Sequence, residues 1–370
     1  MVISKMEFLF GITFDYEGTF IPSEFENLYQ KAYKKIFSFL YSHSDFSVFL
    51  YFSGPVLEWF EKKHPEVITL LSELINRKQI EIIGGGYYSP AFPLILPIDR
   101  VGQTEALTTS IRKILGKRPR GIFLPESIWD PSLISSFKTC GIEYTFLDAQ
   151  LIPQNKFRNI SLFTPVIVED LGKTLYIIPL QQDIDFFHLN NTKDFVNLIK
   201  NKTVSQSNED SVFSTVFSAD DFNKLLKEGI LDSLYLDLIE EESFVFSTPQ
   251  KYLKNATCFN RVTIPSTCSP NLCKWLCEPY VSHSTAIFNS RPNVKDFIET
   301  YPLTHELYAR MIQLSVEINQ CRGDKMRKKN ARDLLWETQN YHLYVYNGKS
   351  SLSNKKNRRK AFENLISAEK

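Results

Sequence analysis

The stretch Arg77-Lys-Gln-Ile-Glu-Ile-Ile-Gly-Gly-Gly-Tyr-Tyr-Ser-Pro90 joins a short apolar run, Gln79–Ile83, to a turn rich in glycine. A short run of this kind, bounded by turn residues and rich in β-formers, is typical of a buried strand. Six similar runs are Glu7–Phe14, Ser47–Phe52, Gly121–Leu124, Thr145–Leu147, Leu175–Ile178 and Ser214–Phe217. Their alternation with segments of helical period predicts an α/β fold with a mostly parallel sheet. Seven strand–helix repeats suggest a barrel.

The helical candidates lie between these runs, and three of them open with proline, which favours the first turn of a helix. They are Pro22–Ser42, Pro55–Arg77, Asp99–Leu115, Pro131–Thr139 and Thr192–Lys200. The alternation fades from about Leu253, and residues 301–347 resemble two amphipathic helices. One apolar stripe comprises Leu307, Met311, Leu314, Val316 and Ile318, and the other Leu334, Leu335 and Trp336. We therefore expect a barrel over 1–260, a helical subdomain over 261–348 and a basic polar tail over 349–370.

Composition narrows the class of protein further. The 370 residues include 43 Lys+Arg and 42 Asp+Glu, a net charge of +1 that does not predict a nucleic-acid partner. No apolar stretch approaches the roughly 20 residues that span a bilayer. Lys5 and Glu7 interrupt the apolar core that a signal peptide needs, so we expect a cytoplasmic chain without a membrane anchor.

The six cysteines are too few for a disulfide scaffold in a chain of this size, and reduced, buried thiols are the simplest expectation. A zinc site built from Cys268, Cys273 and Cys277 is an alternative, although their spacing matches no common zinc module. We expect neither a metal nor another cofactor.

Acidic residues recur at the carboxyl ends of the predicted strands, where a barrel concentrates its chemistry. Besides those considered next, such residues follow three of the runs: Asp15 and Glu17, then Asp148, then Asp183 and Asp185. Strand ends are polar in any barrel, but carboxylates are otherwise depleted in strands. The pattern favours a carboxylate-based active site.

Two of these strand ends carry the clearest candidates. Glu126 stands close to Trp129, and a carboxylate beside an indole is one way in which a glycosidase holds a nucleophile next to a stacked sugar ring. Asp220 and Asp221 follow the run Ser214–Phe217, and they are equally suited to capping the helix that begins there. Capping and catalysis can coexist on adjacent residues.

Several segments together resemble glycoside hydrolase family 57, which includes 4-α-glucanotransferases and α-amylase-like enzymes. They are Phe8–Ile12, Phe52–Trp59, Arg77–Pro90, Arg118–Gly121, Glu126–Trp129 and Cys140–Tyr144, with weaker similarity at Ile264-Pro265, Trp275 and after Tyr301-Pro302. The resemblance implies an incomplete seven-stranded (β/α) barrel followed by a helical bundle that closes the site. It also implies that the C-terminal β-rich domain of many relatives is missing here.

Carried over by position, the resemblance makes Glu126 the nucleophile and Asp221 the general acid/base. It places Glu81 on the acidic strand position of the family, and Trp59 and Trp129 on its tryptophans. Together with the strand ends, it gives the expected substrate-binding residues Asp15, Trp59, Glu81, Tyr87, Trp129, Asp148 and Asp220.

The chain departs from the family at several motif positions. Thr13-Phe-Asp-Tyr-Glu17 replaces His-x-His-Gln-Pro, so both sugar-binding histidines are absent. Ser89 replaces the acid of Tyr-Glu-Pro, Ser127 replaces the arginine after the nucleophile, and Asp221 is followed by Phe222-Asn-Lys224 in place of Gly-Glu-Lys. Near the bundle end, Asn-Asp and Trp-His of the family align loosely with Gln339-Asn340 and Leu343-Tyr344. These changes remove groups that orient sugar hydroxyls and set the charge around the two carboxylates.

Two functions are compatible with this pattern. The first is retaining hydrolysis or transfer of α-1,4-glucosidic bonds in a glucan or maltooligosaccharide through a glycosyl-Glu126 intermediate. The second is a degenerate relative, inactive or weakly active, that binds α-glucan or a partner protein on the aromatic barrel mouth. A metal-dependent polysaccharide deacetylase would need an Asp with a histidine pair at helical spacing, and the six histidines show no such pair.

Overall fold

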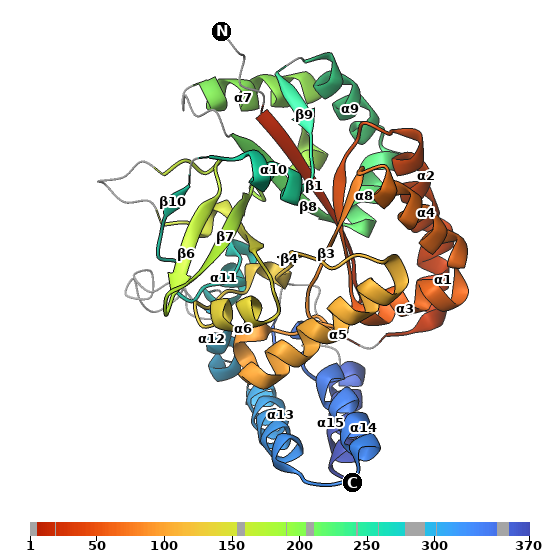
Figure 1. The fold of residues 1–370 in the computed structure, drawn as a ribbon, viewed down its shortest axis with the longest axis vertical. Coiled ribbons are helices and arrows are strands. Elements are labelled where there is room, and N and C mark those ends of the chain that lie inside the picture. Colours follow the sequence, from red (N-terminus) through yellow and green to blue (C-terminus); the bar gives the residue numbers. More distant parts are fainter. Residues whose placement is uncertain are drawn as a thin grey trace.

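The computed structural model describes residues 6–18, 20–153, 160–189, 191–204, 211–241, 243–257, 259–277, 293–300, 302–345 and 355–370. Its strands form two sheets (Figure 1). The first has the order β3 (Ile80–Ile83), β2 (Val48–Phe52), β1 (Met6–Phe14), β8 (Val212–Ser218), and β9 (Phe244–Phe246) pairs with the start of β1. The second has the order β10 (Asn260–Arg261), β6 (Val166–Asp170), β7 (Lys173–Leu180), β5 (Tyr144–Asp148), β4 (Gly121–Ile122).

The two sheets join at both sides into one barrel. A parallel bridge pairs Gly84, just after β3, with Ile122 of β4. On the other side, the amide of Gln181 after β7 donates to the carbonyl of Ser214 on β8 at 2.7 Å. In the part of the chain that the structure describes, the barrel therefore runs β1, β2, β3, β4, β5, β7, β8, and the strand pairs along this path within each sheet are parallel. Strand β6 lies outside the path and pairs with β7 antiparallel. This confirms the incomplete seven-stranded (β/α) barrel.

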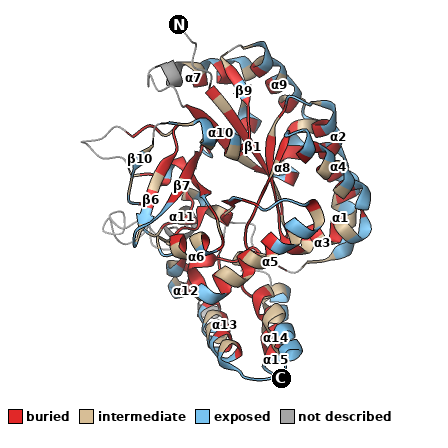
Figure 2. Ribbon diagram, in the orientation of Figure 1, coloured by how far each residue is buried: buried red, intermediate tan, exposed pale blue. Residues whose placement is uncertain are grey.

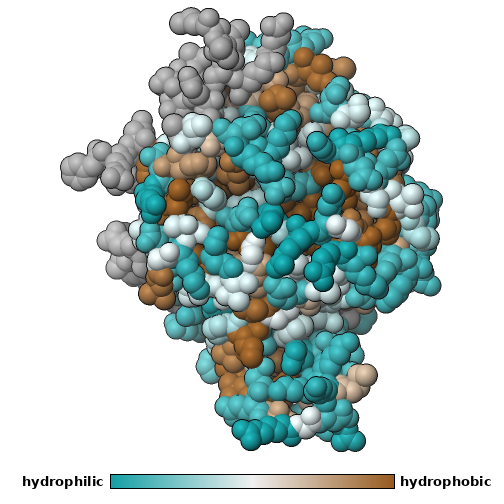
Figure 3. Space-filling model, viewed as in Figure 1, coloured by the Kyte–Doolittle hydropathy of each residue, from teal (hydrophilic) through white to brown (hydrophobic). Residues whose placement is uncertain are grey.

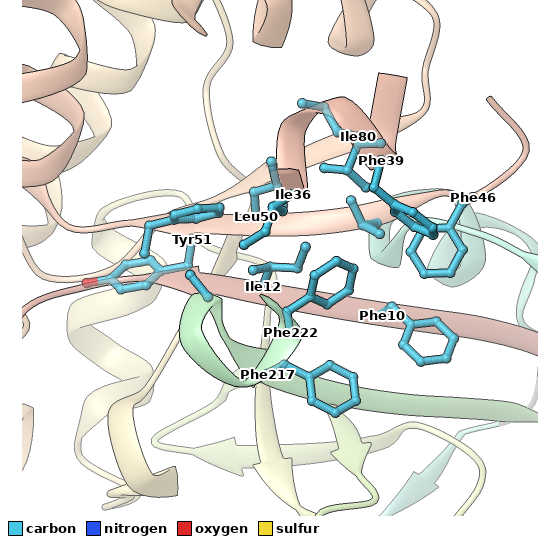
Figure 4. Packing of buried hydrophobic residues seen from close by; sticks show 14 of the residues in the cluster. Phe10, Ile12, Ile36, Phe39, Phe46, Leu50, Tyr51, Ile80, Phe217 and Phe222 are labelled. Atoms are coloured by element: carbon cyan, nitrogen blue, oxygen red, sulfur yellow. The ribbon is translucent and has the colours of Figure 1, made fainter. Parts of the chain in front are cut away.

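The alternation of side chains along the strands builds two cores. Leu9, Phe49 and Phe146 point into the barrel, where the rings of Phe49 and Phe146 stack at 4.6 Å. A β-carbon on Gly11 would lie 2.4 Å from the Phe49 ring, so only glycine leaves room for that ring inside the barrel. Side chains of the opposite parity, including Phe10, Ile12, Leu50 and Phe217, pack outward against the helices (Figure 4). The Tyr51 oxygen points away from this apolar cluster.

Helices cover the outside of the barrel (Figure 2). They are α1 (Pro22–Leu28), α2 (Lys34–Ser42), α3 (Gly54–Lys63), α4 (Pro65–Asn76), α5 (Pro97–Leu115), α6 (Leu133–Thr139), α7 (Thr192–Val204), α8 (Ala219–Lys227), α9 (Ile230–Glu240) and α10 (Pro249–Asn255). A π-helical segment, Tyr29–Tyr33, joins α1 to α2, so the helix predicted over 22–42 is present as three helical segments without a gap. The helix predicted over 55–77 divides at His64, because Pro65 begins a new helix there.

A helical part follows the barrel, and its last helices project at the end opposite α7 and α9 (Figure 1). It comprises α11 (Pro270–Cys277), α12 (Val294–Thr300), α13 (Pro302–Gln320), α14 (Lys325–Glu337) and α15 (Lys355–Glu369). The carboxylate of Asp99 on α5, only 2% exposed, accepts hydrogen bonds from Trp336 Nε1 at 3.1 Å and Gln339 Nε2 at 3.0 Å. Ser315 Oγ of α13 also donates to it. One buried carboxylate thus ties the barrel to the end of the helical part.

Two expectations for the C-terminal region need correction. Val316 is 38% exposed, because it lies off the face defined by Leu307, Met311, Leu314 and Ile318. The basic segment predicted as a polar tail contains α15, whose Ala361 and Leu365 are buried. The domain boundaries remain predictions.

The molecular face drawn in Figure 3 is mainly hydrophilic, with hydrophobic residues scattered singly or in small groups. No helix in the described ranges has both the length and the apolar character needed to cross a membrane.

Candidate active site

The carboxyl ends of the barrel strands bring together the polar residues that follow them. Asp15 follows β1, Ser53 follows β2, Ser89 lies in the loop after β3, Glu126 follows β4 and Asp148 ends β5. Because neighbouring strands are parallel, these ends lie on the same face of the barrel. Three groups of contacts define the site there.

The first group surrounds Asp15. Its carboxylate accepts a hydrogen bond from the Tyr16 amide at 2.9 Å, and the hydroxyl groups of Ser89 and Ser53 lie beside it. Ser89 Oγ is also 2.8 Å from Tyr51 Oη. Asp15 keeps some surface open to solvent, yet the surrounding protein desolvates it enough to raise its pKa to about 6, with a smaller contribution from the charge of Glu17.

The second group fixes Glu126. Pro125–Ser127 form a single 3₁₀ turn, and both Glu126 and Ser127 adopt left-handed backbone conformations, with φ of 51° and 48°. Non-glycine residues rarely adopt this region, at a cost of about 1–3 kcal/mol each. Ser269 holds the turn: its amide donates to the Glu126 carbonyl at 2.8 Å, and its Oγ donates to Glu126 Oε2 at 2.7 Å.

The third group centres on Asp148, which is buried. Its amide donates to Ser127 Oγ at 3.0 Å, and one carboxylate oxygen accepts from the Gln150 amide at 2.9 Å. Burial raises the pKa of Asp148 to about 6, and the nearby charge of Asp183 raises it further. Two carboxyl groups with raised pKa values therefore lie at strand ends on this face of the barrel: Asp148 on β5, next to β4, and Asp15 after β1, three strands away.

Asp221 lies in the first turn of α8, whose N-cap is Ser218. The Asp221 amide donates to Ser218 Oγ at 3.1 Å, while Ser218 Oγ contacts Asp221 Oδ2 at 2.8 Å. Ser218 Oγ thus caps α8 and also donates to the Asp221 carboxylate. Lys224 Nζ lies 3.1 Å from the other carboxylate oxygen, and the pair is largely exposed. In barrel order β4 and β8 are three strands apart in one direction and four in the other, so Glu126 and Asp221 start from opposite sides of the mouth.

Comparison with known families identifies one family that covers most of the chain. Residues 6–265 match the sequence profile described as Glycosyl hydrolase family 57. The chain belongs to glycosyl hydrolase family 57.

Individual relatives support the family 57 assignment. Alpha-amylase 1 of Dictyoglomus thermophilum is 26% identical over 265 residues, which cover 69% of this chain and 38% of that protein. The 4-alpha-glucanotransferase of Thermococcus litoralis is 24% identical over 395 residues, covering 100% of this chain and 58% of the relative. This chain thus spans less than two thirds of the length of either protein.

The same fold occurs in solved family 57 structures. The crystal structure of the 4-alpha-glucanotransferase from Thermococcus litoralis superposes with a TM-score of 0.84 at 23% identity, covering 99% of this chain and 60% of that one. A GH57-type branching enzyme from Pyrococcus horikoshii gives a TM-score of 0.71 at 12% identity, covering 99% of this chain and 88% of that one.

Within this family 57 site, both predicted tryptophans are buried in the protein. Trp59 on α3 packs its ring against Phe25 and Tyr29, at 6.0 and 6.2 Å. Trp129 is 1% exposed, and its Nε1 donates to the Ile264 carbonyl at 3.1 Å. Neither indole has an open face for a sugar in this structure, so their role as substrate platforms remains a prediction without geometric support.

Three other expected substrate-binding residues each have different contacts: Glu81, Tyr87 and Asp220. Glu81 points into the barrel, accepts from Tyr144 Oη and from the Gln250 amide at 2.8 Å, and burial raises its pKa. These partners account for Glu81 structurally. Tyr87 Oη donates to Glu58 at 2.5 Å. Asp220 is exposed at the start of α8, and its charge acts on Tyr33, as does that of Asp15.

Sequence reasoning missed two residues of the site, Ser269 and Tyr341. The Tyr341 amide donates to the Ser89 carbonyl at 3.0 Å, and Asn340 Nδ2 donates to the Tyr88 carbonyl at 3.0 Å. Burial raises the pKa of the Tyr341 phenol, and the charges of Glu126 and Asp15 raise it further. The end of the helical part therefore contributes directly to the barrel mouth.

Among the described residues, no three His, Cys, Asp or Glu side chains are grouped so as to hold a metal ion.

Proposed function

We propose that this chain cleaves or transfers α-1,4-glucosidic bonds with retention of configuration, through a covalent glycosyl intermediate on Glu126. The observation that carries the proposal is the Glu126 turn, in which two successive residues in left-handed conformations present a carboxylate at the barrel mouth. Strained backbone of this kind persists only where its surroundings enforce it, and it concentrates at active sites. The family of the chain supports the same assignment.

In the proposed reaction Glu126 attacks the anomeric carbon while Asp221 protonates the departing glycosidic oxygen. Asp221, now ionised, then takes a proton from water in hydrolysis or from a sugar hydroxyl in transfer. The oxygen that loses the proton attacks the anomeric carbon and breaks its bond to Glu126. Retention requires the two carboxyl groups to lie about 5–5.5 Å apart with substrate bound. Their origin on opposite sides of one narrow barrel is compatible with that requirement.

Sugar hydroxyls would bind where the family histidines are missing. The Asp15 carboxylate can accept hydrogen bonds there. The neighbouring Tyr16 Oη is buried and has no hydrogen-bond partner among the described residues. An unpaired buried hydroxyl costs about 1–3 kcal/mol, which a substrate hydroxyl or a water molecule would recover. On the other side of Glu126, Asp148 would accept from a second hydroxyl.

The test is incubation of the purified chain with maltoheptaose, followed by separation of the oligosaccharide products. We expect shorter products, or both shorter and longer ones, and their loss in Glu126→Gln. Glu143→Gln is the matched control, because Glu143 lies in an exposed ion pair with Arg120 and should not affect turnover. Activity that survives Glu126→Gln would exclude the proposed nucleophile.

The contacts of Asp221 favour a second candidate function, the binding of α-glucan without efficient cleavage. Both carboxylate oxygens of Asp221 are already engaged, one by Ser218 and the other by Lys224. A proton donor must release such contacts before it can reach the substrate. Titration calorimetry with maltoheptaose separates the two functions: binding without products supports the second, and absence of binding excludes both.

A further inference from the structure

A short segment of the chain braces the Glu126 turn from the side of the helical part. The backbones of Trp129 and Thr267 exchange hydrogen bonds at 2.8 and 3.0 Å. The indole of Trp129 holds the Ile264 carbonyl, and the amide of Ser269 holds the Glu126 carbonyl. Residues 264–269 are thereby fixed alongside residues 126–129.

The hydroxyl of Ser269 has a defined orientation at the end of this segment. Ser269 is 8% exposed and immediately precedes α11, and its Oγ accepts from the Leu272 amide at 3.3 Å, as an N-cap does. The hydroxyl has one proton, and the oxygen that lies 2.7 Å away is Glu126 Oε2. Because the Ser269 oxygen accepts from the Leu272 amide, the single hydroxyl proton is left to donate to the Glu126 carboxylate.

We infer that Ser269 is a positioning residue for the nucleophile, holding Glu126 Oε2 so that Oε1 faces the anomeric carbon. This inference rests on the proposed function. Hydrogen bonds to ionised groups are roughly twice as strong as neutral ones. A carboxylate released from such a bond would rotate about its side-chain torsions and spend less time in the attacking geometry.

The experiment compares Ser269→Ala, Ser269→Gly and Ser269→Thr with the parent chain on maltoheptaose. Glycine is a tolerated N-cap, so Ser269→Gly removes the hydroxyl and largely preserves α11 if the alanine variant folds poorly. We expect kcat to fall about 10- to 100-fold in both, with KM changed less than about threefold, and threonine to restore most of the loss. Ser266→Ala, which removes a hydroxyl bound to Asp130 in the same segment, should keep kcat within about twofold.

An unchanged kcat, or a rise in KM that accounts for the whole effect, would overturn the inference. A parent chain without turnover refutes the proposed function instead. In that case a double-mutant cycle of Ser269→Gly with Glu126→Gln in thermal unfolding tests the contact alone. Non-additive effects support the contact between the side chains, and additive effects exclude it.

A second, independent observation concerns two thiols on either side of Ser269. Cys268 Sγ and Cys273 Sγ lie 3.7 Å apart, and Cys273 Sγ also contacts the Cys268 carbonyl at 3.5 Å. Cys268 is fully buried, whereas Cys273 on α11 is partly exposed. A disulfide requires an S–S distance of about 2.05 Å, so the sulfurs would need to approach by roughly 1.6 Å.

We propose that Cys268 and Cys273 are a reversible disulfide site whose oxidant is a small-molecule disulfide. The Cys273 thiolate attacks one sulfur of the oxidant, the S–S bond of the oxidant breaks, and its other sulfur leaves as a thiolate. The attacked half stays on Cys273 as a mixed disulfide. Cys268 then attacks Cys273 Sγ and displaces the second half of the oxidant. Both cysteine protons pass to the two departing thiolates, so two protein thiols are oxidised and one small disulfide is reduced. Because Ser269 lies inside the closed loop, the new bond should displace it from Glu126.

The test uses the reduced full chain and oxidised glutathione, with peptide mapping after alkylation. We expect a Cys268–Cys273 linkage and a fall in turnover of about 10- to 100-fold, reversed by dithiothreitol, because a displacement of about 1 Å at a reacting group can cost 100-fold. Cys273→Ser should retain the basal activity and resist the treatment, and Cys321→Ser, an exposed thiol elsewhere, should respond like the parent chain. Separate alkylation of both thiols after oxidation would overturn the site, and a linkage that leaves turnover unchanged would overturn its effect on Ser269.

Discussion

Replacing Asp15 by asparagine should make the protein more stable at neutral pH while weakening its action on glucan. The Asp15 pKa is raised to about 6 by burial, against 3.8 for a free aspartate, which means that the fold disfavours the charged form. Asparagine has nearly the same shape and keeps an oxygen for the Tyr16 amide. It can also contact Ser53 and Ser89, because its amide group both donates and accepts.

The magnitude follows from proton linkage. A difference of about 2 pKa units corresponds to about 3 kcal/mol. Because the folded pKa lies above the unfolded one, the folded state binds more protons between pH 4 and 6, so stability falls as pH rises through that window. Above about pH 6 the ionised Asp15 carboxyl destabilises the folded state by the full amount. Partial exposure of the carboxyl reduces the gain expected from Asp15→Asn to about 1–3 kcal/mol at pH 8.

The assay is thermal unfolding of parent and variant at pH 4 and at pH 8. An unfolding entropy of about 2.1 cal/mol/K per residue over 370 residues converts 1 kcal/mol into a melting shift of about 1.3 °C. We expect Asp15→Asn to melt roughly 1–4 °C higher at pH 8 and to match the parent at pH 4, while exposed Asp45→Asn shifts neither. A variant less stable at pH 8 would show that the Asp15 charge supports the fold, which contradicts the reasoning.

Three further outcomes are expected. Burial lowers the His342 pKa to about 3, so the folded protein resists protonation of this ring and loses stability as pH falls below 6.5. In urea unfolding at pH 4, His342→Gln should therefore raise the free energy of unfolding by about 3 kcal/mol. Ser218→Ala removes the α8 cap and should lower the free energy of unfolding by about 1 kcal/mol in the same assay. If Asp221 is the acid, turnover should also fall several-fold in this variant, and unchanged turnover would argue against that role. Asp99→Ala leaves the buried donors of Trp336 and Gln339 unpaired and should cost about 3 kcal/mol, whereas a loss below about 1 kcal/mol would contradict their pairing.

The barrel strands could be predicted because each is a short apolar run between turn residues. All seven predicted runs correspond to barrel strands. Strand β6 escaped prediction because its hairpin with β7 turns through Leu171 and Gly172, which have φ of 48° and 75°. Leucine is rare in that conformation, so the sequence lacks the Asn-Gly or Asp-Gly signal of such turns.

The site was predictable only as far as strand ends reveal it. Asp15, Glu126 and Asp148 follow their strands directly, and the fold brings them to one face. Ser269 lies 143 positions from Glu126 in the sequence, and no local pattern distinguishes it from other serines. Sequence alone could not show that the two tryptophans are buried, since a large aromatic side chain fills a core as readily as it stacks on a sugar.

The substitutions around Glu126 alter the charge of the site. Serine stands at two positions where the family resemblance implies charged side chains. Ser89 lies beside the Asp15 carboxyl, and Ser127 Oγ accepts from the backbone amide of Asp148. Neutral hydroxyls thus replace one acid and one cation, while the acidic group appears at position 15 instead. Glycoside cleavage passes through an oxocarbenium-like transition state, whose positive charge nearby carboxylates stabilise. Above about pH 6, where Asp15 and Asp148 are ionised, their charges would oppose the formation of any further anion but favour that cation. The loss of the arginine therefore removes an interaction with the nucleophile while lowering the electrostatic cost of the transition state, and a chain with these substitutions need not be inactive.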